Sequence, residues 1–139
     1  MPSLNLEIVG PWPEENGHTP GRNVLNTLLS ALRAGGWEAE SEPDNWRDSG
    51  WSIHLGRDTQ MLVTHVSDQT YWAQITALHS PSLLARLFKK DAWAKTDADV
   101  SRCGEILSRE LATQESLTVR RWNWDGPADE GQSDPVFRH

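Results

Sequence analysis

The chain has 139 residues, of which 20 are acidic and 13 are basic, and its net charge at neutral pH is -7. This length suits a single domain with a real core, and the excess of acid opposes binding to a nucleic-acid backbone. The mean hydropathy of -0.62 and the lack of an apolar run of about 18 residues argue against a membrane protein.

The first ten residues, MPSLNLEIVG, have no basic region followed by an apolar stretch, so we expect no secretory signal. Cys103 is the only cysteine, which excludes an internal disulfide and favours the cytoplasm. Eight tryptophans are unusual for this length, and tryptophan favours cores and interfaces.

In the first half of the chain, period-2 alternation predicts a strand over residues 4–9. Prolines and glycines then predict a loop over 10–21. A helix follows, with Thr19 as its expected cap, an apolar face from Val24 to Leu32, and a stop at Gly35 and Gly36. WEAESE, residues 37–42, reads as a strand, and PDNWRDSG, 43–50, as a loop.

In the second half, three strands are expected at 51–56, 61–66 and 71–78, joined by the short hairpin connections RDTQ and SDQT. Ser80 and Pro81 open a predicted helix, and Thr96 or Asp97 is expected to cap another. A last strand spans 116–124, and the Gly-, Pro- and acid-rich residues 126–139 read as a coil tail.

The predicted order is therefore β-α-β-β-β-β-α-α-β within one domain, residues 1–139. Strands joined by short turns pair antiparallel. We expect an α+β fold with a sheet of five to six antiparallel strands and helices packed on one face.

Which strand side chains face the helices depends on the hairpin that RDTQ closes. If RDTQ is a four-residue loop, Gly56 lies opposite Met61 and His54 lies opposite Val63. His54, His65 and Trp72 then share the face away from the helices, together with Ser52, Met61, Val63, Gln74 and Thr76. The helix-facing set is Trp51, Ile53, Leu55, Leu62, Thr64, Val66, Tyr71, Ala73, Ile75 and Ala77.

Two histidines on adjacent strands raise the question of a metal or acid–base site. In this register their side chains can meet, whereas an odd-length turn would separate them. A zinc site needs three or four ligands, and that face offers no Asp, Glu or Cys. We therefore expect no metal, no cofactor and no catalytic residues there. Cys103 falls on an apolar helical stripe, which indicates core packing rather than a nucleophile.

The acidic residues suggest a binding surface instead. Alternation places Glu38, Glu40 and Glu42 on one side of the expected strand, and Asp44 and Asp48 continue the negative surface. One interpretation is an edge strand protected by charge, and the other is a landing site for a basic partner with Trp46 as its anchor. Arg120 and Arg121 form a local basic cluster, and one interpretation is that they pair with those acids.

Several stretches together resemble the small cytoplasmic immunity proteins that bacteria make against secreted toxins: GWEAE, GWSIHL, YWAQI, SLLARLF and WNWDGPADE. The resemblance is architectural and spans most of the chain. It implies a single acidic α+β domain that neutralises one cognate toxin by covering it.

The first functional hypothesis is accordingly a non-catalytic binding protein of immunity type with a protein partner and without nucleic-acid or membrane binding. The expected contacts are Glu38, Glu40, Glu42, Asp44, Trp46 and Asp48, with the face of His54, His65 and Trp72 as second choice. The alternatives are a secretion chaperone that holds an effector on the open sheet face, and an enzyme of unrecognised type.

Overall fold

The computed structural model describes residues 3–10, 21–39, 43–45, 50–55, 59–67, 69–77, 94–114, 117–126 and 130–133, without the side chains of 44, 45, 77 and 94–97. Its strands are β1 (Ser3–Val9), β2 (Asp44–Asn45), β3 (Trp51–His54), β4 (Thr59–Ser67), β5 (Thr70–Ala77) and β6 (Thr118–Trp124). Its helices are α1 (Arg22–Ala34) and α3 (Ala94–Leu111).

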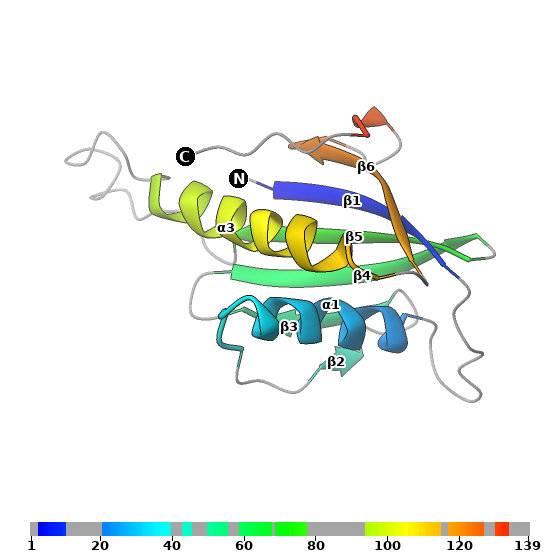
Figure 1. The fold of residues 1–139 in the computed structure, drawn as a ribbon, viewed down its shortest axis with the longest axis horizontal. Helices are drawn as coiled ribbons and strands as arrows, with labels where there is room; N and C mark the ends of the chain where they lie inside the picture. Colours follow the sequence, from blue (N-terminus) through cyan, green and yellow to red (C-terminus); the bar gives the residue numbers. More distant parts are fainter. Residues whose placement is uncertain are drawn as a thin grey trace.

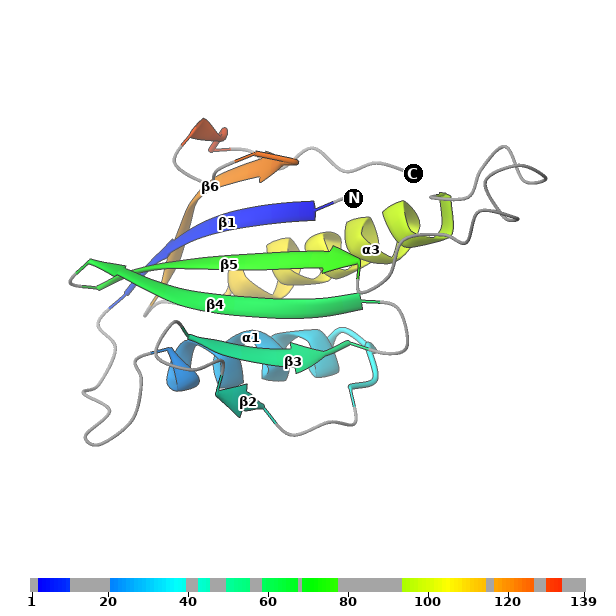
Figure 2. The ribbon, with the colours of Figure 1, turned by 180° about the vertical axis from the view of Figure 1, so that it is seen from behind.

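The six strands form one antiparallel sheet in the order β2-β3-β4-β5-β1-β6. Figure 1 shows α1 and α3 side by side on one face, with α1 over β3 and β4 and α3 over β5 and β1. The view from behind in Figure 2 presents the sheet in front of both helices. The predicted α+β class, antiparallel pairing and one-sided helix layer are thus confirmed.

The core lies between this sheet and the two helices. Alternate side chains of five strands point into it and are nearly or fully buried: Leu4, Leu6, Ile8, Trp51, Ile53, Met61, Val63, Tyr71, Ala73, Ile75 and Trp122. Leu25, Leu28 and Leu32 of α1 and Val100, Cys103 and Leu107 of α3 close it from the other side. Both helical stripes match the 3.6-residue periodicity that predicted them.

The end of α1 follows from its two glycines. Gly36 has φ +95°, and the N–H of Trp37 donates to the Leu32 carbonyl at 2.9 Å while the N–H of Gly36 donates to the Arg33 carbonyl at 3.0 Å. This is a Schellman cap, which needs a residue that tolerates the left-handed region. The predicted stop at Gly35 and Gly36 is confirmed.

Three local predictions were wrong. Gly21, with φ +120°, caps α1 in place of Thr19. Helix α3 already includes Thr96 and Asp97 and therefore starts before either can cap it. Residues 37–39 are not a strand, and the short β2 lies at residues 44–45, inside the segment expected to be a loop. The helix expected from Ser80 lies outside the described residues.

The most consequential error concerns the face of β4. His54 pairs with Gln60 rather than with Val63, and Leu55 donates its N–H to the Thr59 carbonyl at 2.8 Å to close the turn. The register differs from the expected one by an odd number of residues, which sends each β4 side chain to the opposite face. Met61 and Val63 therefore enter the core, and Leu62 and Thr64 point away from the helices.

The β6 edge of the sheet is extended by the following segment. The backbones of Trp122 and Gln132 exchange two hydrogen bonds, of 2.7 and 2.9 Å. Part of the expected coil tail is thus attached to the sheet. Within the described ranges, neither helix combines the length and apolar character needed to cross a bilayer.

Candidate binding surface

The sheet face opposite α1 and α3, here called the open face, carries no helix in the part of the chain that the structure describes (Figure 2). Strand register assigns these side chains to it: Ser3, Asn5, Glu7, Val9, Ser52, His54, Gln60, Leu62, Thr64, Thr70, Trp72, Gln74, Thr76, Thr118, Arg121 and Asn123. Amides and hydroxyls predominate in this set.

A row of side chains, polar except for Leu62, crosses the middle of the open face. Ser52, Leu62, Gln74, Asn5 and Asn123 lie opposite one another on β3, β4, β5, β1 and β6. Gln74 Nε2 donates to Asn5 Oδ1 at 3.0 Å, and Asn5 Nδ2 approaches the Asn123 carbonyl at 3.4 Å. These bonds hold the amide groups in place, so this part of the surface is ordered before any ligand arrives.

Trp72 is the aromatic centre of the open face. Its side chain is half-buried, and its indole Nε1 is shielded from water without a hydrogen-bond partner in the described part of the chain. A shallow hollow of about 290 Å³ lies beside it, lined mainly by apolar atoms and including Leu62 and Thr64. Gly50 borders this hollow, and a Cβ at that position would collide with the Val63 carbonyl. The aromatic ring and the hollow together form a concave apolar patch.

A buried carboxylate lies next to that patch. Glu7 pairs in register with Trp72 on one side and Arg121 on the other, and its side chain is only 9% exposed. Its Oε1 lies 3.5 Å from Nη1 of Arg120, whose side chain is 52% exposed. The irregular register between Glu7 and Ile8 leaves Arg120 as an extra residue of β6. A bulge of this kind changes the direction in which its side chains point.

The residues predicted to form the acidic contact are only partly described. Glu38 is exposed just beyond α1, and residues 37–39 lack the strand geometry that would align it with its neighbours. Asp44 lies in β2, but its side chain is not described. Glu40, Glu42, Trp46 and Asp48 lie outside the described residues. Arg120, which one interpretation paired with these acids, lies 3.5 Å from Glu7.

The two histidines do not meet. His54 belongs to the open face, whereas the observed β4 register puts His65 on the helix side. There its ring lies 4.9 Å from that of Tyr71. The expectation that His54, His65 and Trp72 share one face was therefore wrong for His65. Among the described residues, no group of three His, Cys, Asp or Glu side chains is placed to hold a metal ion.

Cys103 lies in the core, as predicted. Burial raises the pKa of its thiol far above the usual range, and Asp99 adds to the shift while Arg102 opposes it. The thiolate needed for nucleophilic attack is therefore disfavoured.

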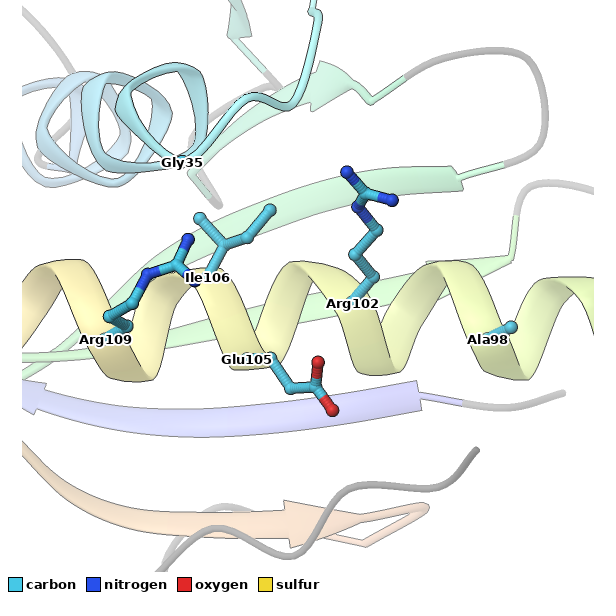
Figure 3. Close-up of a pocket in the computed structure, with 6 residues that line it drawn as sticks. All are labelled: Gly35, Ala98, Arg102, Glu105, Ile106 and Arg109. Atoms are coloured by element: carbon cyan, nitrogen blue, oxygen red, sulfur yellow. The ribbon is translucent and has the colours of Figure 1, made fainter.

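A larger hollow, of about 470 Å³, lies between α3 and the end of α1 (Figure 3). Arg102 and Arg109 extend on either side of Ile106 toward α1, while Glu105 points the other way. The carbonyl end of α1 carries partial negative charge, which these guanidiniums complement. Arg109 also lies 3.5 Å from Glu110. Helix packing and charge balance account for this arrangement without a ligand.

Sequence reasoning named Trp72 as a contact, placed Gln74 on the same face without making it a contact, and missed Asn5 and Glu7. A signal for both missed residues was present, because alternation in LNLEIV already places Asn5 and Glu7 on the same side of β1.

Comparison of the chain with protein-family models, curated proteins and solved structures finds no significant match in any of the three.

Proposed function

We propose that this chain is a non-catalytic binding protein of the immunity type, which neutralises a bacterial toxin in the cytoplasm by covering it with the open face. The composition of that face carries the proposal. Protein interfaces are enriched in aromatic residues and depleted in Lys, Asp and Glu. The open-face set given above combines Trp72 with many amides and hydroxyls, and its charged members are Glu7 and Arg121.

Preorganisation supports the same conclusion. Binding costs free energy for each side chain that must be ordered. The hydrogen bonds from Gln74 to Asn5 and from Asn5 to its neighbours already order the central row. A half-buried tryptophan beside a hollow resembles the anchors that dominate binding energy in interfaces.

The net charge of -7 has a different role in this proposal. Long-range potential speeds the encounter with a basic toxin, and the effect weakens as salt rises. The predicted acidic contacts beyond α1 belong to this long-range field, whereas Trp72 and the amide row make the close contacts.

The test is co-expression with a product of the adjacent genes that stops growth when it is expressed alone. The wild-type chain should restore growth, and Trp72→Ala should lose this protection with at least a tenfold weaker Kd by calorimetry. Trp37→Ala is the matched control, because Trp37 is also half-buried and its shielded indole Nε1 has no hydrogen-bond partner among the described residues, but it lies just beyond α1. Failure of the wild-type chain to restore growth, or equal loss in both variants, would refute the proposal.

The open face also supports the second candidate, a secretion chaperone that holds an effector before export. The same experiment separates the two functions. An immunity protein abolishes the toxin's activity in the purified complex, whereas a chaperone binds through Trp72 and leaves the effector's catalytic site working.

A further inference from the structure

Glu7 and Arg120 form a charged site at the β6 side of the open face. A carboxylate removed from water requires a compensating partner. Arg120 provides it at 3.5 Å and still has about half of its side chain in solvent. Glu7 therefore attracts a guanidinium that remains accessible to solvent.

Arg120 has donor capacity beyond this contact. A guanidinium carries five N–H donors in a planar fork suited to carboxylates. The contact to Glu7 joins one nitrogen to one oxygen, and 3.5 Å is long for a charge-assisted hydrogen bond. The remaining donors of Arg120 can engage an acidic group from outside the chain.

An apolar site adjoins this charged one. Trp72 lies directly opposite Glu7 on β5, and β6 is two strands away from β5 in the sheet. Two strand spacings correspond to about 10 Å. The hollow beside Trp72 and Leu62 has room for an apolar side chain. The two sites together therefore suit a ligand that has an acidic group at one end and an apolar group at the other.

We propose that this end of the open face binds a segment of the partner protein that carries a carboxylate for Arg120 and an apolar side chain for the hollow beside Trp72. The inference rests on the proposed function and specifies its contact chemistry. Locally, the partner is thus acidic, even though the net charge of this chain favours a partner that is basic as a whole. Glu7 is the positioning residue that orients Arg120.

The test uses a synthetic peptide and does not require the toxin. Acetyl-Leu-Ala-Ala-Glu-amide is titrated into the ¹⁵N-labelled chain and compared with the same peptide ending in Gln. The Trp72 indole and Arg120 Nε–H signals should shift with the Glu peptide, and the fitted Kd should be at least fivefold tighter than with the Gln peptide.

Variants complete the test. Arg120→Gln should remove the preference for the Glu peptide, Arg120→Lys should retain part of it, and Arg102→Gln on α3 should leave it unchanged. Unfolding midpoints verify that each variant is folded. Absent shifts, equal shifts with both peptides, or equal effects of Arg120→Gln and Arg102→Gln would overturn this inference. Failure of the toxin to bind would instead overturn the proposed function.

Discussion

The face assignment of β4 can be tested by placing one charge at two adjacent positions. Met61 is fully buried in the core, whereas Leu62 is half-buried on the open face. Met61→Asp forfeits about 1.5–3 kcal/mol of side-chain burial and adds several kcal/mol for an unpaired buried carboxylate. The sum is comparable with a typical stability of about 5–15 kcal/mol. We therefore expect Met61→Asp to be largely unfolded.

Leu62→Asp should behave differently. The aspartate there stays in contact with water, and only part of a leucine's burial is lost, which amounts to about 1 kcal/mol. Urea unfolding followed by far-UV circular dichroism measures both variants, with Leu62→Ala as a control for the lost side chain. A folded Met61→Asp together with an unfolded Leu62→Asp would restore the register first expected from the sequence and refute the observed one.

Further predictions concern close packing at two glycines and the chemistry of the cysteine. Gly35→Ala places a methyl group against Ile106 and should lower the free energy of unfolding in urea by about 1–3 kcal/mol. The double variant Gly35→Ala/Ile106→Ala should lose less stability than the sum of the two single variants, because the second substitution removes the clash. Gly50→Ala should cost more than Gly35→Ala in the same assay, because its Cβ collides with the backbone of Val63, which cannot rotate away. The Cys103 thiol should resist a disulfide reagent in the native chain and react in urea. Because burial raises its folded-state pKa, stability should fall as pH rises above about 8.5, where the unfolded thiol ionises, and Cys103→Ala should remove this component.

Elements with a strong periodic pattern were predictable from the sequence. The apolar stripe of α1 and its double-glycine end have a local cause, so the prediction needed no knowledge of the rest of the chain. Strands β3 to β5 were also located within a few residues. In contrast, WEAESE alternates as a strand would, yet Trp37 completes the cap of α1 and the described part of that segment does not join the sheet.

The candidate surface was harder to predict because it depends on non-local register. The segment MLVTHV has apolar residues at both parities, so periodicity cannot choose its buried side, and the closing bond between Leu55 and Thr59 decides it. Asn5 and Asn123 meet across a separation of 118 residues. No local pattern indicates that β1 inserts between β5 and β6, and this insertion brings Glu7 between Trp72 and Arg121.

Glu7 offers the clearest way to separate a structural role from a binding role. An ion pair in which one partner is buried, as Glu7 is here, is weak evidence for stability, since desolvation offsets much of its attraction. Glu7→Gln leaves Arg120 half-exposed and hydrated, so no charge remains buried without a partner. We expect the free energy of unfolding to change by no more than about 1 kcal/mol. The Arg120 guanidinium nevertheless loses its anchor, and the preference for the Glu peptide over the Gln peptide should fall at least threefold. A large loss of stability in urea, with the peptide preference intact, would show that Glu7 supports the sheet alone and does not orient Arg120.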